Sequence, residues 1–313
     1  MTPLGPALGR GLAMLGLVVL VMLGLYQGLW QWLGDPQLPS VWRGLFSAHG
    51  VCAIALCLLS YGLRGQRWRL WVAACGYPTH WRQGMRVYLA GYSFTPTPGN
   101  LGEAARGLLM RPQAMPISSS VAVFAAERLQ DLLVLVLLAV PALLWPPLNV
   151  PRGLVLALGI LVLLALWLSG HEQAWGWGLR RVPTRVQRWL ALEQAQQCLR
   201  HRPYLTQSLT LLAWSAQGLA VWLLCRQVDL SLDVLHAAAA YAMAMVAGAL
   251  STLPAGLGGM EATLLGLLTQ QEVSTALALL LTLQVRLLTL WLAVAIGLVT
   301  LVYGWRVDRN PHP

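Results

Sequence analysis

The sequence predicts an all-α polytopic membrane protein, built as a single transmembrane domain over residues 1–313. Hydrophobic residues make up 57% of the chain and charged residues only 10%, and the mean hydropathy is +0.62. A soluble globule of this size needs more polar surface than that. Six apolar runs are long enough to cross a bilayer core of about 30 Å as helices. They are Leu12–Leu33, Leu45–Leu63, Ile117–Trp145, Leu154–Leu168, Thr206–Cys225 and Val273–Tyr303.

Two further apolar stretches, 81–110 and 233–270, are interrupted in their middles by Pro and Gly. A helix does not run straight through such clusters, because Pro removes a backbone donor and Gly adds flexibility. We therefore expect each stretch to form a re-entrant hairpin, which brings the total to about eight membrane segments. The residues expected to break the hairpins are Pro96, Pro98, Gly99, Gly102, Pro254, Gly256, Gly258 and Gly259.

Arginines outside the spans predict the orientation, because cytoplasmic loops are enriched in basic residues. We place two groups in such loops: Arg64, Arg67 and Arg69 after the second span, and Arg180, Arg181, Arg185, Arg188, Arg200 and Arg202 after the fourth. The expected location is the bacterial cytoplasmic (inner) membrane, with both termini in the cytoplasm. The first hairpin then opens to the cytoplasm and the second to the outside.

The chain divides near its midpoint into two halves, about 1–150 and 151–313, with the same plan of span, span, broken hairpin and span. An odd number of spans inserts the second half upside down, as in the inverted repeats of many secondary transporters. The spacing of charged residues agrees with this plan. Arg128 follows Glu103 at the same interval along the chain as Arg286 follows Glu261.

Charged side chains within membrane segments cost several kcal/mol and usually face a partner or a water-filled cavity. Glu103 and Arg106 are one helical turn apart and are expected to pair, while Glu127 and Asp131 share one helix face. The candidate substrate-binding residues are Arg106, Arg128, Arg286, Glu103, Glu127, Asp131 and Glu261.

Interrupted helices at membrane depth favour a polar cavity, because their free backbone groups need partners there. Helices beginning near Gly102 and Gly259 would direct their positive ends into this cavity, where a phosphate is stabilised. The arginines add guanidinium groups suited to a phosphodiester. The carboxylates would neutralise them, receive a head-group amine or carry a coupling proton. The structural alternative is that these ion pairs only lock the hairpins to neighbouring spans.

Several kinds of chemistry have no residues to support them. The chain contains no Lys, which excludes a Walker A lysine and a Schiff base. Its 5 cysteines form no C-x-x-C pair and its 6 histidines lack metal-ligand spacing. We therefore expect no disulfide framework, no metal, no cofactor and no ATP-driven transport by this chain alone.

Three patches of the sequence resemble the lysylphosphatidylglycerol synthase transmembrane region family, a group of flippase-like, UPF0104-type membrane proteins. The patches are Thr97–Arg106, Glu127–Asp131 and Leu253–Glu261, with Arg286 in the expected later place. In bifunctional members this region is thought to move an aminoacylated phospholipid between leaflets. The chain ends soon after its last span, so we expect a stand-alone member without the aminoacyl-transferase domain. A more distant similarity is to DedA-type scramblases, which also pair re-entrant hairpins.

Together these features predict a lipid flippase or scramblase for phospholipids or other phosphate-bearing lipids, rather than an enzyme. The alternative is a membrane enzyme or scaffold in polyprenyl-linked or phospholipid head-group metabolism. The expected partners are membrane phospholipids or polyprenyl-linked lipids. A lipid-modifying enzyme and a second copy of the chain are further candidates, and no nucleic acid is expected.

Overall fold

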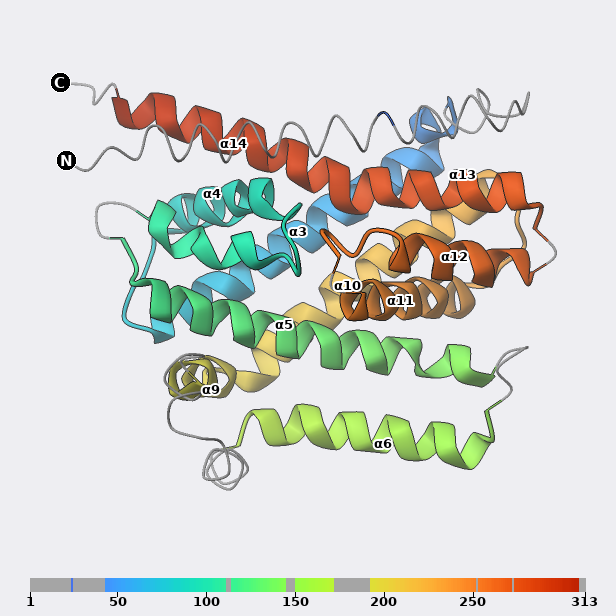
Figure 1. Ribbon diagram of the computed structural model, residues 1–313, viewed down its shortest axis with the longest axis horizontal. Helices are drawn as coiled ribbons and strands as arrows, with labels where there is room; N and C mark the ends of the chain where they lie inside the picture. Colours follow the sequence, from blue (N-terminus) through green and yellow to red (C-terminus); the bar gives the residue numbers. More distant parts are fainter. Residues whose placement is uncertain are drawn as a thin grey trace.

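The computed structural model describes residue 24 and residues 43–110, 114–144, 150–171, 192–251, 253–271 and 273–309, with side chains up to residue 302. Within these ranges the chain is helical and forms no β-strand (Figure 1). The first predicted span, 12–33, lies outside them apart from residue 24, as do Arg180, Arg181, Arg185 and Arg188 of the second predicted arginine-rich loop.

The long elements are α3 (Ala48–Ala74), α5 (Ile117–Ala139), α6 (Arg152–Ser169), α10 (Pro203–Gln227), α13 (Thr275–Arg286) and α14 (Leu292–Arg309). The shorter elements are η1 (Gly44–Phe46), α4 (Trp81–Gly91), η2 (Tyr92–Phe94), η3 (Leu101–Leu109), η4 (Val140–Leu144), α9 (Leu192–Arg200), α11 (Val234–Leu250), α12 (Gly259–Thr269) and the π-helical η5 (Leu287–Trp291).

Four of the described helices are long and apolar enough to cross a membrane: Ala48–Ala74, Arg152–Ser169, Pro203–Gln227 and Thr275–Val302. They match four of the predicted spans. A fifth predicted span forms α5, which is 23 residues long but carries three charged residues, Glu127, Arg128 and Asp131. The last predicted span is one continuous helical rod in which η5, a single π-helical segment, follows Arg286. Such segments are frequent at functional sites.

Local sequence explains where several helices begin. Ser47 caps α3 by accepting from the Gly50 amide, and Ser274 caps α13 by accepting from the Leu277 amide. Asp233 caps α11 through the His236 amide at 2.8 Å. Such side chains satisfy amides that have no partner within the first helical turn.

The predicted cytoplasmic loop after the second span is wrong. Arg64, Arg67 and Arg69 do not lie in a loop, because α3 continues through them to Ala74. Arg64 and Arg67 are buried, with 8% and 0% of their surface exposed. A loop arginine is solvated, whereas these two face the protein interior, so they no longer support the cytoplasmic placement of this segment.

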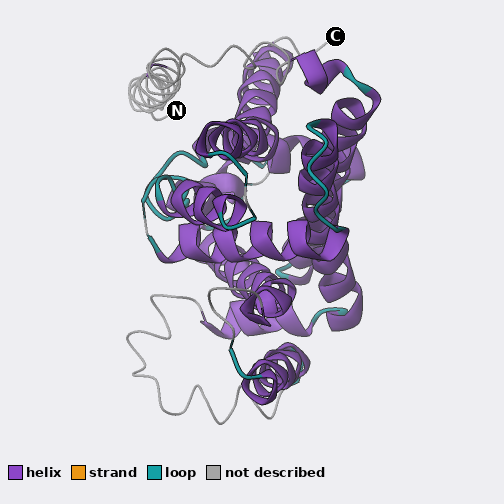
Figure 2. Cartoon of the chain, turned by 90° about the vertical axis from the view of Figure 1, so that its right-hand side faces the viewer, coloured by secondary structure: helices purple, strands orange, loops and turns teal. Residues whose placement is uncertain are grey.

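Both interrupted stretches form helix–break–helix hairpins, as predicted. The first consists of α4, η2, a break and η3, and the second of α11, a break and α12. Figure 1 shows that they open at opposite ends of the molecule and that their breaks meet at its centre. There Pro98 and Pro254 form an isolated antiparallel bridge. Figure 2, a view along the long axis, shows several helices nearly end-on and others that run across the view.

The two breaks share one backbone pattern. Each bridging proline is followed by two residues in the left-handed region, Gly99 (φ 58°) and Asn100 (φ 57°) in the first hairpin. The second hairpin has Ala255 (φ 54°) and Gly256 (φ 66°). Left-handed geometry is unfavourable for residues with a Cβ, and Asn tolerates it better than Ala. The same turn is therefore built twice, from different residues.

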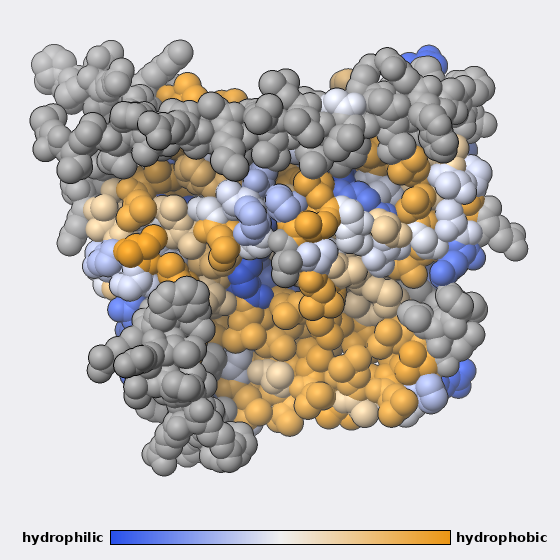
Figure 3. Space-filling view, in the orientation of Figure 1, coloured by the Kyte–Doolittle hydropathy of each residue, from blue (hydrophilic) through white to orange (hydrophobic). Residues whose placement is uncertain are grey.

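The outer surface on one side is apolar. Figure 3 shows a continuous hydrophobic area over the lower part of the molecule, where α5 and α6 lie in Figure 1, and a band of more hydrophilic side chains above it. Helix α6 contributes exposed apolar residues: Leu154, Leu156, Ile160, Leu161, Leu163, Leu164 and Trp167. A surface of this kind suits contact with lipid tails better than contact with water.

Candidate functional site

The carboxylates of α5 form the centre of a buried charge cluster. Glu127 and Asp131 are 1% and 3% exposed, and both face Arg67 of α3. Nη1 of Arg67 lies 2.6 Å from Oδ1 of Asp131, and Nη2 lies 3.5 Å from Oε1 of Glu127. The predicted shared face of these two carboxylates is therefore confirmed, and their common partner is an arginine from a different span.

Helix α10 adds polar contacts to the cluster around Arg67. The Thr210 hydroxyl accepts from Nη1 of Arg67 at 2.7 Å and from Nε2 of Gln130 at 2.9 Å. Trp214, one turn later, donates from Nε1 to Oδ1 of Asp131 at 3.0 Å. Such hydrogen bonds offset part of the cost of burying the ion pair.

The first hairpin is attached to the same cluster through η3. Arg106 pairs with Glu103 on η3, as predicted, and donates from Nη1 to Oε2 of Glu127 at 2.8 Å. Thr95 in the break donates to Oε1 of Glu103 at 2.7 Å. The guanidinium of Arg106 also lies 4.5 Å from the ring centre of Tyr88 on α4. Both limbs and the break are thus fixed to α5 through this arginine.

A second ion pair holds the second hairpin against the last span. Nε of Arg286 donates to Oε1 of Glu261 at 2.6 Å, and Nη2 donates to Oε2 at 3.1 Å. Nη2 also donates to the carbonyl of Gly256 in the break, at 3.0 Å. In addition, Oε2 of Glu261 accepts from the Gly258 amide at 2.8 Å. The start of α12 is thus partly occupied by its own Glu261, rather than left open for a phosphate as the sequence suggested.

The two combinations of Glu and Arg that recur at equal spacing in the sequence are both close in space. Glu261 and Arg286 form the bidentate pair just described, and Nη2 of Arg128 lies 3.8 Å from Oε2 of Glu103. The two pairs differ in strength, because Arg128 is nearer to Asp131, at 3.2 Å, and 35% of its side chain is exposed. Arg128 is therefore the least enclosed arginine among these ion pairs.

A cavity of about 250 Å³ lies where the two hairpin breaks meet. Its lining includes Arg128, Asp131, Trp214 and Arg286, together with Gly99 and Asn100 of the first break and Leu253, Ala255 and Gly256 of the second. The rest of the wall is apolar: Leu132, Leu135, Met245, Gly248, Ala249 and Met260. One water needs only about 10–15 Å³ of such volume. The cavity therefore has room for several waters or a small polar group.

The predicted substrate-binding residues occupy three positions relative to this cavity, and Glu261 lies outside its lining, in the pair with Arg286. Arg128, Asp131 and Arg286 line it, as do the break residues Gly99 and Gly256. Glu103, Arg106 and Glu127 are buried in the adjoining cluster instead. Each of them forms an ion pair within the protein, and Arg106 and Glu127 link the first hairpin to α5 next to the cavity.

The sequence did not predict three residues of the site and its surroundings: Arg64, Arg67 and Trp214. The arginines follow an apolar run and were interpreted as a loop. Ser60, Arg64, Arg67 and Trp71 repeat every three or four residues, so a helix continued through them places them on one face, but only the structure shows that this face is buried. No sequence signal separated Trp214 from the many other tryptophans of the chain.

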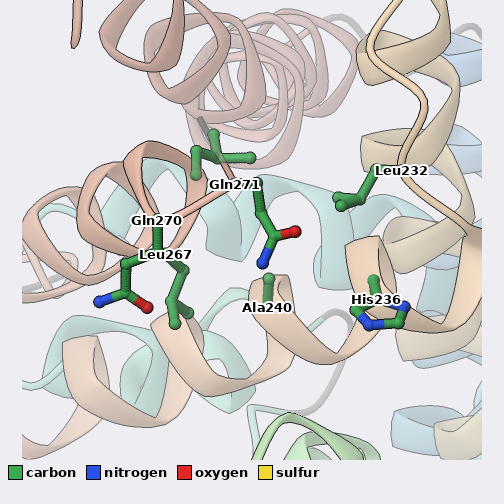
Figure 4. Close-up of a pocket in the computed structure, with 7 residues that line it drawn as sticks. Leu232, His236, Ala240, Leu267, Gln270 and Gln271 are labelled. Atoms are coloured by element: carbon green, nitrogen blue, oxygen red, sulfur yellow. The ribbon is translucent and has the colours of Figure 1, made fainter. Parts of the chain in front are cut away.

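The described part of the chain offers little for other ligands. It contains no group of three or more His, Cys, Asp and Glu side chains arranged to hold a metal ion. A second hollow lies between the open ends of α11 and α12, where Leu232, His236 and Gln271 surround it (Figure 4). Its volume of about 10 Å³ is too small for more than a single water.

Comparison with known families gives one match over nearly the whole chain. The model described as "Lysylphosphatidylglycerol synthase TM region" matches residues 11–297. This range includes both hairpins, the buried charge cluster and the cavity. Curated proteins and solved structures give no match.

Proposed function

Because the chain belongs to the lysylphosphatidylglycerol synthase TM region family and is therefore a multi-pass membrane protein, we propose that it moves a phosphate-bearing lipid between leaflets. The head group would pass through the cavity between the hairpin breaks while the acyl tails stay in the bilayer. The main support for this proposal is the position of two arginines. Arg128 and Arg286, which come from opposite halves of the sequence, line the same cavity together with both breaks.

The architecture supports a path that reaches the cavity from both sides of the membrane. Two hairpins that open at opposite ends would each re-enter the bilayer from one face, and their tips would meet near its middle. The matching left-handed turns and the two equally spaced Glu–Arg pairs favour an inverted repeat. Transporters with such repeats place their substrate sites at the repeat interface near the midplane.

The ion pairs suggest how a phosphate would be bound and released. Arg128 is held by Asp131 at 3.2 Å and more weakly by Glu103 at 3.8 Å, so part of its hydrogen-bonding capacity is available. A phosphate entering the cavity would compete with these carboxylates for Arg128 and with Glu261 for Arg286. Exchange of partners of this kind lets the arginines bind a head group without trapping it. In this scheme Glu103 and Glu261 restore the empty state after release.

Reconstitution into liposomes tests the proposal. Purified protein should accelerate the movement of a fluorescent phospholipid between leaflets, measured by chemical quenching of the outer leaflet, relative to protein-free vesicles. Arg128→Ala and Arg286→Ala should each slow this movement. Arg82→Ala is the matched control, because Arg82 is exposed on α4.

Folding has to be checked separately, because Arg286 is buried in its pair with Glu261. Gel filtration and helical circular dichroism of each variant provide this check. Unchanged rates in folded Arg128→Ala and Arg286→Ala would remove both residues from the mechanism. Rates equal to those of protein-free vesicles for the unaltered chain would overturn the proposal, and release of free phosphate or head group would indicate an enzyme.

A further inference from the structure

The charged groups around the cavity do not balance. Among the described residues, the buried cluster, the cavity wall and the Glu261–Arg286 pair contain five arginines, Arg64, Arg67, Arg106, Arg128 and Arg286, against four carboxylates, Glu103, Glu127, Asp131 and Glu261. Arginine stays protonated in proteins, so these groups together carry at least one excess positive charge. A buried charge without a counter-charge is unfavourable, which makes the site receptive to an anion.

The excess charge is located on Arg64. Each of the other four arginines has a carboxylate oxygen at 3.2 Å or less. Arg64 forms no ion pair with a described carboxylate. Its one side-chain hydrogen bond runs from Nη2 to the Ser60 hydroxyl at 3.2 Å, and its Nε is buried without a partner among the described residues.

Trp214 connects Arg64 to the cavity. The guanidinium carbon of Arg64 lies 4.6 Å from the ring centre of Trp214, a cation–π contact. The same indole donates to Asp131 and forms part of the cavity wall beside Arg128. One aromatic ring therefore contacts both the unbalanced cation and the space proposed for the head group.

We propose that Arg64 makes the cavity selective for lipid head groups with a net negative charge. This inference rests on the proposed function and specifies its substrate class. An anionic phosphodiester head group would neutralise the excess charge of the empty site. A zwitterionic head group brings its own cation and leaves that excess in place. Electrostatic attraction across a low-dielectric wall is strong enough to separate the two classes.

The test compares two labelled lipids in the same vesicles. Liposomes of constant composition contain a trace of acyl-labelled phosphatidylglycerol, with net charge −1, or of acyl-labelled phosphatidylcholine, with net charge zero. The unaltered protein should move phosphatidylglycerol about tenfold faster than phosphatidylcholine. Arg64→Gln should reduce this ratio to about twofold or less. Arg82→Gln removes the same charge from an exposed position and should keep the ratio.

Two further variants separate charge from shape and from folding. Arg64→Lys keeps the charge and should keep most of the preference. Ser60→Asp replaces the hydroxyl that accepts from Arg64, one turn away on α3, by a carboxylate and should reduce the ratio as Arg64→Gln does. Loss of preference in Arg64→Lys, or its full retention in Ser60→Asp, would contradict the role of charge.

The outcomes also separate this inference from the proposed function. If the unaltered protein moves both lipids equally well, the selectivity is wrong while lipid movement stands, whether or not the variants fold. If Arg64→Gln keeps the full preference for phosphatidylglycerol, the preference comes from other residues and the proposed role of Arg64 is wrong. Movement of neither lipid above the protein-free rate would overturn the proposed function and this inference with it.

Discussion

Replacing Arg67 by methionine removes the residue that joins three helices of the charge cluster. Arg67 is completely buried, and its guanidinium contacts Asp131 at 2.6 Å, Thr210 at 2.7 Å and Glu127 at 3.5 Å. Methionine fills much of the same volume and keeps the helix propensity of α3. The substitution therefore tests the charge and its hydrogen bonds more than the packing.

The contacts set the size of the expected effect. Removing one partner of a buried ion pair typically costs about 3–5 kcal/mol, because a charge is left uncompensated. Here Asp131 keeps Arg128 at 3.2 Å and Glu127 keeps Arg106 at 2.8 Å, so neither carboxylate is left alone. We therefore expect the lower end, about 3 kcal/mol of unfolding free energy, which is roughly a hundredfold in the folding equilibrium.

Unfolding in mixed detergent micelles, followed by loss of tertiary fluorescence, measures this cost. Arg82→Met is the matched control, because Arg82 is exposed on α4 and surface substitutions change stability by about 0.5 kcal/mol or less. Asp131→Leu and the double variant with Arg67→Met complete a double-mutant cycle. Direct contact predicts that the double variant loses at least about 1 kcal/mol less than the sum of the single losses.

Two results would refute this reasoning. One is an Arg67→Met variant as stable as Arg82→Met, which would mean that Arg67 is solvated, as a loop arginine would be. The other is strict additivity in the cycle, which would mean that Arg67 and Asp131 act independently. In either case the burial of α3 against α5 through this pair would be wrong.

The remaining predictions concern the hairpin breaks and the burial of α3. In a cysteine-free background, Pro98→Cys combined with Pro254→Cys should form a disulfide on mild oxidation, because residues in an antiparallel bridge lie within disulfide reach. The disulfide is detected as a mobility shift on a non-reducing gel. A lack of cross-linking would contradict the contact between the two hairpin breaks. Gly256→Ala should lower the unfolding free energy by about 2 kcal/mol, because φ is +66° and a Cβ would lie 3.0 Å from the backbone of α11. Ala255→Gly should raise it by about 0.5 kcal/mol by relieving a left-handed alanine, and the opposite sign in the same unfolding assay would contradict the turn geometry. In the same background, Arg67→Cys should resist a membrane-impermeant thiol reagent added to opened vesicles, and rapid labelling would return this residue to a loop.

The positions of the helices and of their interruptions were readable from the sequence. Apolar length sets where a span lies, and Pro with Gly sets where a helix stops, because both are properties of the local backbone. For this reason the breaks at Pro98 and Pro254 appear where they were expected. The pairing of Glu103 with Arg106, one turn apart on η3, was equally local.

The role of α3 was not readable in this way. Arg64 and Arg67 follow an apolar run, and an isolated arginine is too costly in a membrane to be placed there without a known partner. The partner of Arg67 is Asp131, 64 residues further along the chain, and the choice between loop and buried helix depends on that contact. Sequence periodicity shows which residues share a face but not what the face meets.

The sequence by itself determined which residues are charged, where the helices break and which glutamate and arginine recur at equal spacing in the two halves. Only the tertiary structure decided that Arg128 and Arg286 share one cavity, that Arg106 is enclosed in the adjoining cluster, and that Arg64 has no carboxylate partner among the described residues. The physical reason is the distance along the chain over which each property is set. Backbone conformation depends on near neighbours, whereas the environment of a charge depends on which distant segments pack around it.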